Sequence, residues 1–409
     1  MSSVQVDLSL ALRNVVRQTR RSAIALSAVC FGVVAILLAG GFIEWIYQAM
    51  REDTIHSHLG HVQIVRPGYL DSGLADPYAY LLPDTSDERK AIESLPHVVT
   101  LAPRLAFSGL ISHDDSTLSF IADGVDPEKE VLLSRTLQIS KGEGLSSSDP
   151  LGIIVGDGLA ANLGVTVGDT VVLVANTATS GINAVECHVR GLFSTVTKAY
   201  DDMALRLPLP VAHRLLRVSG AHRWLVLLDD TARTDELVAQ LQAQLRGAKL
   251  QVVPWTQLAD FYNKTVVLFS KQVSVVKLVI AVIIVLSISN TLMMSVVERT
   301  GEIGTSMALG YGRLAILRLF IGEGMLLGFL GGASGLILGQ MLAHLISAIG
   351  IPMPPPPGMA LGFTGEILIT WRLAFDAFAL AFGTTLLASV YPAWTASRMV
   401  IVDALRHSR

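Results

Sequence analysis

The distribution of apolar and polar positions divides the chain into four long apolar segments and one large region of mixed polarity. The apolar segments cover 22–44, 273–297, 320–349 and 373–396. A helix needs about 20 apolar residues to cross the hydrocarbon core of a bilayer, and each segment supplies that length. The pattern therefore predicts four transmembrane helices, one before and three after the region 45–272.

The region 45–272 shows short runs that are typical of a folded domain outside the bilayer. Strand-like runs lie at 61–65, 118–122, 152–155, 170–175, 185–193 and 224–228. Helix-like runs lie at 85–94, 157–163, 209–218 and 234–245. This mixture predicts an α+β domain with two subdomains. The flanking stretches 44–58 and 255–272 keep a helical pattern without being fully apolar, so we expect stalk helices that continue the spans.

Composition and the placement of charge agree with this layout. Hydrophobic residues make up 51% of the chain and charged residues only 16%, whereas soluble domains carry about a quarter. No Lys or Arg lies between 350 and 371, while arginines collect at the opposite ends of the spans: Arg13, Arg17, Arg20, Arg21, Arg299, Arg313, Arg318, Arg398, Arg406 and Arg409. Basic loops stay in the cytoplasm. We therefore expect 1–21, 298–319 and 397–409 inside, and 45–272 and the Pro-rich loop 350–372 outside.

The N-terminal segment predicts an anchor and not a cleaved leader. The apolar run of 22–44 is longer than the roughly 7–15 residues of a signal-peptide core, and no Ala-x-Ala site follows it. Residues 1–21 read as an interfacial helix whose arginines face lipid phosphates, or as a plain basic flank. Cys30 lies in the first span and Cys187 in the outer region, so we do not expect them to pair.

Several patterns that carry chemistry elsewhere are weak or missing here. No GxxxxGK[ST] pattern occurs, so we expect no P-loop ATP site in this sequence. The run 156–161 matches GxGxxA, but no βαβ unit follows, which favours a structural turn. His56, His58 and His61 could ligate zinc, yet no carboxylate or cysteine completes the set. A polar junction between stalk and domain is the better interpretation, and we expect no catalytic and no metal site.

The polar stretch after the second span holds the candidate functional residues. Glu298, Arg299 and Glu302 are spaced to form pairs on a helix surface. Glycines then break the helix, so we expect a short segment along the membrane plane. Glu323 follows at the start of the third span, where an unpaired carboxylate is costly. It should pair with a basic residue or lie at the interface, and a structural role is favoured over a proton relay.

The third span is rich in glycine, at the spacing that lets helices approach closely in lipid. The glycines form two rows four residues apart: Gly324, Gly328 and Gly332, and Gly331, Gly335 and Gly339. We expect packing on neighbouring helices at Gly324, Gly328, Gly332 and Gly335. The proline-rich run 352–358 is stiff and extended, and is either a rigid cap over the spans or a spacer.

The pattern E-R-x-x-E-I-G-x-x-x-A-L-G, from Glu298 to Gly310, resembles the MacB/FtsX family of ABC-transporter permeases. The Gly-rich third span, the run A-L-R-N at 11–14 and the ending Y-P-A-W-T-A-S-R at 391–398 are similar to the family too. The ending lacks the proline that often follows its arginine. Within the family, the outer stretches 60–64, 159–169 and 191–202 resemble the lipoprotein-releasing (LolC/LolE-type) permeases.

The resemblance implies a segment that couples the spans to a separate cytoplasmic ATPase. Its residues would be Glu298, Arg299, Glu302, Ile303, Gly304, Ala308, Leu309 and Gly310. Two permease chains, identical or paralogous, would bind two ATPase copies, which alone hold ATP and Mg²⁺. This chain would then be a non-catalytic subunit without a cofactor. ATP-driven closure would tilt the spans, and the stalks would carry the motion to the periplasmic domain.

The implied function is extraction or export of a lipoprotein-like or amphipathic substrate from the bacterial inner membrane. Two alternatives stay open. One is a MacB-type efflux permease with a periplasmic adaptor, and the other is FtsX-like signalling to a periplasmic partner. The expected partners are the ATPase, the second permease chain, membrane lipid and a periplasmic adaptor or acceptor, with no nucleic acid. The sequence leaves the substrate and the type of dimer open.

Overall fold

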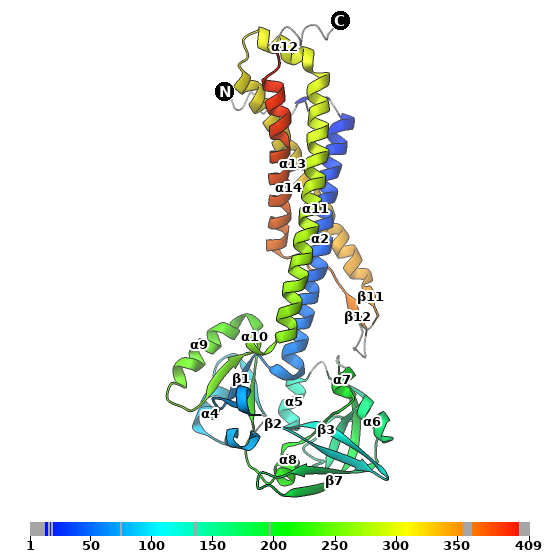
Figure 1. Ribbon diagram of the computed structural model, residues 1–409, viewed down its shortest axis with the longest axis vertical. Coiled ribbons are helices and arrows are strands. Elements are labelled where there is room, and N and C mark those ends of the chain that lie inside the picture. Colours follow the sequence, from blue (N-terminus) through cyan, green and yellow to red (C-terminus); the bar gives the residue numbers. More distant parts are fainter. Residues whose placement is uncertain are drawn as a thin grey trace. The chain divides into compact units, whose positions relative to one another are not determined.

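The computed structural model of the chain (Figure 1) describes residues 13–14, 17, 19–73, 76–134, 137–195, 198–354 and 362–400. Most of the interfacial helix predicted over 1–21 and most of the tail lie outside these residues. The chain divides into two compact units. The helical unit comprises Met1–Gln48, Thr265–Pro352 and Thr364–Arg409, and the sheet unit comprises Ala49–Lys264 and Met353–Phe363.

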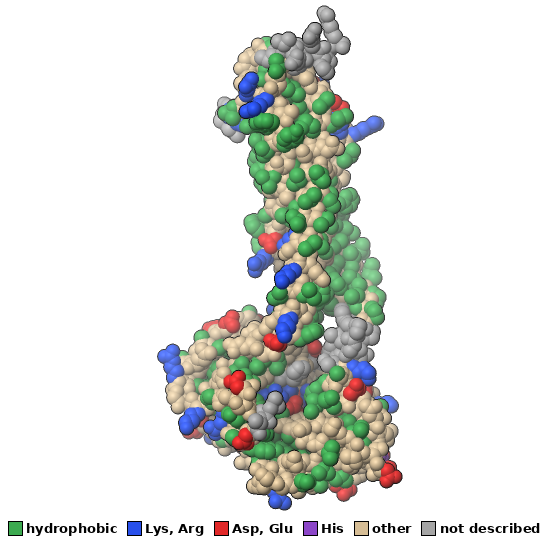
Figure 2. Space-filling view, viewed as in Figure 1, with side chains coloured by type: hydrophobic (Ala, Val, Ile, Leu, Met, Phe, Trp, Pro, Cys, Tyr) green, Lys and Arg blue, Asp and Glu red, His purple; other side chains and the backbone are tan. Residues whose placement is uncertain are grey.

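Four helices that are long and apolar enough to cross a membrane dominate the helical unit. They are α2 (Thr19–Thr54), α11 (Asp260–Glu298), α13 (Arg313–Ile349) and α14 (Trp371–Ser397). Hydrophobic side chains cover much of the visible surface of these long helices, as Figure 2 shows. The prediction of four transmembrane helices, one before and three after an α+β domain, is confirmed.

Two features of the helical unit add to the sequence-based expectation. Helix α13 begins at Arg313, ahead of the apolar segment 320–349, because the preceding stretch continues the same helical pattern. The expected loop between the third and fourth spans contains two short paired strands, β11 (Ile351–Met353) and β12 (Phe363–Gly365). Prolines 355–357 of the proline-rich run lie outside the described residues.

Helix α13 packs against a different neighbour on each of its two glycine rows. A Cβ built on Gly324 would lie 2.5 Å from the Cβ of Ser389 on α14, and one on Gly332 would lie 2.8 Å from the Phe378 ring. On the other row, a Cβ on Gly335 would lie 2.7 Å from the Cβ of Val33 on α2. These glycines allow α13 to approach both helices more closely than larger residues would permit.

The sheet unit contains a mixed sheet of ten strands among the described residues. The strands are β1 (Val62–Val65), β2 (Val98–His113), β3 (Ser116–Val125), β4 (Gln138–Gly142), β5 (Gly152–Gly156), β6 (Thr170–Asn176), β7 (Ile182–Ser194), β8 (Ala204–Pro208), β9 (Arg223–Leu228) and β10 (Gln251–Pro254). Their order is β10-β1-β9-β2-β3-β8-β5-β7-β4, and β6 pairs with β2 and β7.

The helices of the sheet unit are short and connect these strands. They are η1 (Ile55–Leu59), α3 (Tyr69–Ser72), η2 (Pro77–Tyr80), α4 (Asp87–Glu93), α5 (Pro127–Leu133), α6 (Asp157–Leu163), α7 (Lys198–Asp201), α8 (Leu209–Leu216), η3 (Thr231–Arg233), α9 (Thr234–Gln244) and α10 (Trp255–Leu258). The predicted stalk over 255–272 is interrupted, because Ala259 leaves helical geometry between α10 and α11.

Four clusters of buried hydrophobic residues lie in the described part of the sheet unit, and the two largest form its main cores. One core joins β1 and β9 to α4 and α9, and includes the buried side chains of Ile64, Trp224 and Leu241. The other joins β5, β6 and β7 to α6 and α8. Strands β2 and β3 pair over ten residues and run between the two cores, so they make the sheet continuous.

A buried network of charges links the strands where the two cores meet. On β2, the Arg104 guanidinium binds Glu130 Oε1 of α5 at 2.6 Å, and Arg206 of β8 binds the same oxygen at 2.6 Å. Arg223 binds Asp123 at 3.2 Å. Burial would raise the pKa of Asp123, but the guanidinium groups around it outweigh burial and lower its pKa to about 2. Removing one member would leave a buried charge unpaired.

Candidate functional site

The segment between α11 and α13 carries most of the predicted coupling residues. Helix α11 ends at Glu298, and α12 (Thr300–Ala308) begins after one intervening residue, Arg299. A turn then leads into α13, and Gly310 adopts a φ of 99° in it. A side chain at that φ would be strained, so glycine suits this position. We call residues 299–312 the connecting segment.

The carboxylate of Glu323 joins the connecting segment to the N-terminal part of the chain. Glu323 is only 4% exposed. Its Oε1 accepts hydrogen bonds from Asn14 Nδ2 and from Arg299 Nη1, both at 2.7 Å. The Arg299 guanidinium also lies 5.4 Å from the centre of the Phe320 ring. Of the two environments that the sequence allowed for Glu323, the structure shows pairing with a basic residue.

The other two acidic residues of the motif pair with arginines that precede the first span. Arg21 forms an ion pair with Glu298. Arg17 lies 3.3 Å from Glu302, which is also 3.4 Å from Arg299. A pocket of about 150 Å³ lies among these groups. The expected helix-surface pair between Arg299 and Glu302 is therefore present, whereas Glu298 binds a distant part of the chain.

Sequence reasoning missed the role of the N-terminal residues in this network. It left Arg17 and Arg21 either facing lipid phosphates or in a plain basic flank, whereas the structure places them on carboxylates more than 270 residues away. Asn14 was not singled out as a partner. The only signal was that acidic residues and arginines are both found at the ends of the spans, which does not say which pairs form.

The remaining predicted coupling residues divide into a buried and an exposed set. Ile303 and Gly304 are buried, and Ile303 packs in a cluster that includes Phe320. They hold the segment in place and are not accessible to a partner. Ala308, Leu309 and Gly310 are exposed, and Leu309 is 81% exposed.

Two further apolar residues are exposed next to Leu309. Tyr311 is 48% exposed and Leu314 is 62% exposed. Sequence reasoning did not select either of them, although both follow directly on the glycine turn. Together with Leu309 they form what we call the apolar tip. Exposed apolar residues that together form a contiguous patch are a common mark of a contact surface.

His61, near the start of the sheet unit, is part of the hydrogen-bonded structure of that unit. His61 is buried, its Nε2 lies 3.0 Å from the Thr231 hydroxyl, and its Nδ1 accepts the Leu228 N–H at 3.0 Å. Both ring nitrogens are thus engaged. Burial, aided by the nearby His56, lowers the pKa of His61 to about 4. Among the described residues, no group of His, Cys, Asp and Glu could hold a metal ion.

The GxGxxA run forms a tight strand-to-helix turn between β5 and α6. A Cβ on Gly156 would lie 2.3 Å from the carbonyl oxygen of Asp201, and one on Gly158 would clash with Asp202. The glycines therefore make room for the chain around α7. Their positions are explained by packing within the sheet unit.

Comparisons with known proteins match both parts of the chain. The family model of the MacB-like periplasmic core domain matches residues 22–244, and that of the FtsX-like permease C-terminal matches 274–401. The periplasmic region of MacB from Actinobacillus actinomycetemcomitans is similar in structure, with 12% identity and a TM-score of 0.36, over 50% of this chain and 93% of that one.

Three relatives illustrate the range of similar sequences. The macrolide export ATP-binding/permease protein MacB of Syntrophobacter fumaroxidans is 29% identical over 52% of this chain, but the match spans only 28% of that relative's length. An uncharacterized ABC transporter permease of Methanocaldococcus jannaschii is 22% identical over 99% of both chains. The lipoprotein-releasing system transmembrane protein LolC of Xylella fastidiosa is 25% identical over 76% of this chain and 78% of its own length.

These matches identify the family. The two family models cover the first span with the sheet unit, and then the last three spans with the connecting segment. The first of them alone matches more than half of the 409 residues. The chain therefore belongs to the MacB/FtsX family of ABC-transporter permeases.

Proposed function

We propose that this permease works with a separate cytoplasmic ATPase subunit, which binds ATP and Mg²⁺ and contacts the connecting segment. The apolar tip carries the proposal. Leu309 and Tyr311 are exposed on the connecting segment and Leu314 on the first turn of α13, whereas Ile303 and Gly304 of the segment are buried. A short segment of this kind can enter a groove of another protein and transmit movement, because its base is fixed while its tip is free to bind.

The Glu323 network supplies the fixed base. Arg299 at the start of the segment binds Glu323 of α13, and Glu323 also binds Asn14 ahead of α2. A push on the apolar tip would reach α11, α13 and the residues before α2 together. Buried charge-assisted hydrogen bonds are strong and directional, so they suit the transmission of a displacement. The proposal is that ATP-driven closure tilts the spans and thereby moves the sheet unit.

For the substrate, we propose a lipoprotein-like or amphipathic molecule that is extracted from the inner membrane. The similarity to LolC relatives over 76% of the chain supports this class. A MacB-type efflux permease with a periplasmic adaptor is the second candidate, and the MacB-like family model over 22–244 favours it. FtsX-like signalling rests on the C-terminal family model alone.

We further propose that both termini are cytoplasmic, that the sheet unit is periplasmic and that a second permease chain completes the transporter. The arginines at one end of the spans support the orientation. The wide apolar face of α11 supports a partner chain. Only 11% of the most apolar stretch of α11 is buried within the chain, and Leu278 and Leu286 are each 65% exposed. Lipid or the second chain would cover this face.

The decisive experiment compares two exposed residues in different units. The chain is tagged, purified gently from its native membrane in nonhydrolysable ATP, and co-purifying proteins are identified by mass spectrometry. Leu309→Glu places a charge on the apolar tip, and Ile182→Glu places one on an equally open site of the sheet unit, where Ile182 is 76% exposed. We expect an ATPase with the wild type and with Ile182→Glu, and its loss with Leu309→Glu. Retention in all three samples would disprove the proposed contact.

A further inference from the structure

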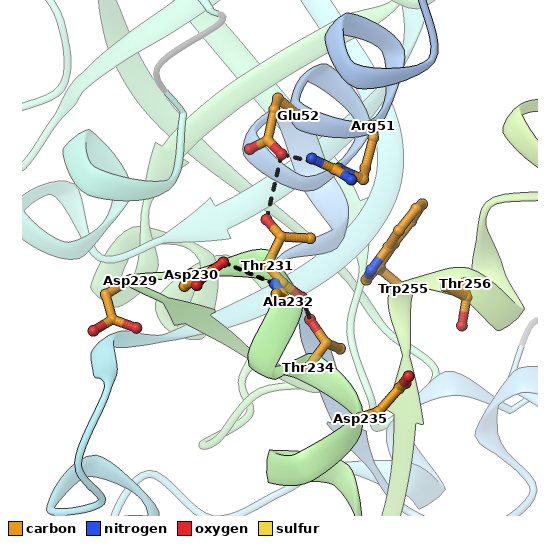
Figure 3. A pocket seen from close by; sticks show the side chains of 10 residues that line it. All are labelled: Arg51, Glu52, Asp229, Asp230, Thr231, Ala232, Thr234, Asp235, Trp255 and Thr256. Carbon is orange, nitrogen blue, oxygen red and sulfur yellow. Dashed lines mark hydrogen bonds and ion pairs between the residues drawn. The ribbon is translucent and has the colours of Figure 1, made fainter. Parts of the chain in front are cut away.

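A pocket of about 460 Å³ lies in the sheet unit, beside the chain segments that connect this unit to α2 and α11. Its lining comes from the end of α2, the loop after β9, η3, the start of α9, and α10. Figure 3 shows the ten lining residues, which are Arg51, Glu52, Asp229, Asp230, Thr231, Ala232, Thr234, Asp235, Trp255 and Thr256. No coupling residue of the helical unit contributes to it.

The pocket carries an excess of negative charge. Four carboxylates face a single guanidinium, and that guanidinium is already bound, because Arg51 Nε donates to Glu52 Oε1 at 3.1 Å. Asp229 lies 2.9 Å from His97, and Asp230 accepts the Ala232 N–H at 2.9 Å as the cap of η3. Asp235 is exposed and has no charged or hydrogen-bonding partner in the described part of the chain.

The arrangement of these carboxylates argues for an extended ligand. No group of His, Cys, Asp and Glu in the described residues converges closely enough to hold a metal ion. Metal ions need several oxygen ligands at 2.0–2.6 Å from one point. Carboxylates spread around an open pocket fit positive charges that are spaced along a chain. Thr231, Thr234 and Thr256 add hydroxyl groups to the lining.

Trp255 gives a second, independent indication of the ligand. The side chain is only 5% exposed and packs edge-on against Tyr262, with 5.1 Å between ring centres. Its indole nitrogen lies at the edge of the ring that faces Ala232 across the pocket (Figure 3). Among the described residues, no acceptor is bonded to this N–H. The nitrogen is not among the enclosed unpaired polar atoms of the described residues, so it is open to the pocket and can donate to an acceptor of a bound ligand.

We propose that this pocket binds a basic peptide segment of a partner protein. Lysine or arginine side chains of the segment would pair with Asp235 and its acidic neighbours, and a backbone carbonyl would accept the Trp255 N–H. A peptide offers both groups at once. A polyamine offers the positive charges without the carbonyl acceptor, and a bare cation offers neither the spacing nor the acceptor.

The site has a clear position for regulating the sheet unit. A bound segment would touch Glu52 at the end of α2 and Trp255 in α10, which belong to two of the chain segments that join the sheet unit to the spans. It would also touch the start of α9. The inference stands apart from the proposed ATPase contact, because binding here requires no movement of the connecting segment.

The test measures peptide binding to the full-length chain in lipid nanodiscs without any ATPase. The probe is an acetylated, amidated hexapeptide of alternating lysine and glycine, labelled for fluorescence anisotropy, and its control replaces lysine by glutamine. We expect saturable binding of the lysine probe only. Asp235→Asn and Trp255→Phe should each weaken its Kd about tenfold, the effect of losing one strong polar contact.

The neighbouring carboxylate provides the matched control. Glu236 is exposed on the same turn of α9 but does not line the pocket, so Glu236→Gln should change the Kd by less than about twofold. Equal weakening by Asp235→Asn and Glu236→Gln would show unspecific attraction and overturn the proposal. So would the absence of saturable binding. If spermidine displaces the lysine probe equally well from the wild type and from Trp255→Phe, the pocket binds polyamines instead of a peptide.

Discussion

Replacing Glu323 by glutamine tests whether the charge network is the rigid base of the connecting segment. The substitution keeps an oxygen that can accept the Asn14 amide but removes the negative charge that faces Arg299. Glu323 is 4% exposed and the Arg299 side chain 12% exposed. Little water can therefore replace the lost partner.

The magnitude follows from this burial and from the 2.7 Å contact. Breaking a buried ion pair by removing one partner costs about 3–5 kcal/mol. Glu302, at 3.4 Å, still offers Arg299 some compensation, and a hydrogen bond to a charged group is worth about 1.5–3 kcal/mol. We therefore expect Glu323→Gln to lower the free energy of unfolding by about 2–3 kcal/mol. Removing both charges, with Arg299→Met added, should restore part of this loss.

The assay is a double-mutant cycle on the full-length chain in mixed micelles, with helix content followed by circular dichroism as a denaturing detergent is added. We expect the cycle of Glu323→Gln and Arg299→Met to give a coupling energy of about 2 kcal/mol. Glu302→Gln is the control, because Glu302 is 55% exposed and should contribute less than about 1 kcal/mol. Effects that add within about 0.5 kcal/mol would refute a structural pair at this site.

Three further predictions concern other parts of the chain. Gly324→Leu should lower the free energy of unfolding by about 1–3 kcal/mol, because its Cβ would meet Ser389. Gly383 faces open space, so Gly383→Leu should not have this effect. Thermal unfolding of the two variants distinguishes them. Gly310→Ala should reduce ATPase co-purification through a strain of about 1–2 kcal/mol at φ 99°, and Gly312→Ala, at φ −71°, should not. Burial, aided by the Arg223 charge, lowers the pKa of His222 from its ordinary 6.5 to about 4. The unfolded chain then binds the extra proton, so stability should fall by up to about 3 kcal/mol as pH drops from 6.5 to 4. In a denaturant series followed by circular dichroism, His222→Gln should flatten this slope, and an unchanged slope would contradict the assignment.

The spans could be predicted from the sequence because a membrane helix needs only a long apolar run. The two glycine rows of α13 were visible for a similar reason, since a spacing of four residues places glycines on one helix face. The long strand β2 was missed, although it pairs with three other strands. Pro103 lies within it opposite Trp224, and a proline ordinarily argues against a central strand.

Only part of the candidate site could be predicted from the sequence, for a different physical reason. The motif from Glu298 to Gly310 is continuous in sequence, so a resemblance could find it. Glu298 and Glu302 take their partners from Arg21 and Arg17, and such long-range pairing leaves no local pattern. The exposure of Leu314 and the burial of Ile303 depend on how α12 folds back on α13, which spacing alone does not fix.

The pairing of Arg17 and Arg21 with acidic residues far along the chain has a consequence for biosynthesis. These arginines leave the ribosome first, and Glu298 and Glu302 follow only some 280 residues later. During that interval their charges are uncompensated and can orient the first span at the membrane. Once α11 is inserted and α12 has formed, the same charges are neutralised by pairing. The arginines would thus act first as a topology signal and afterwards as a latch, which closes only when the later spans have arrived in the correct orientation.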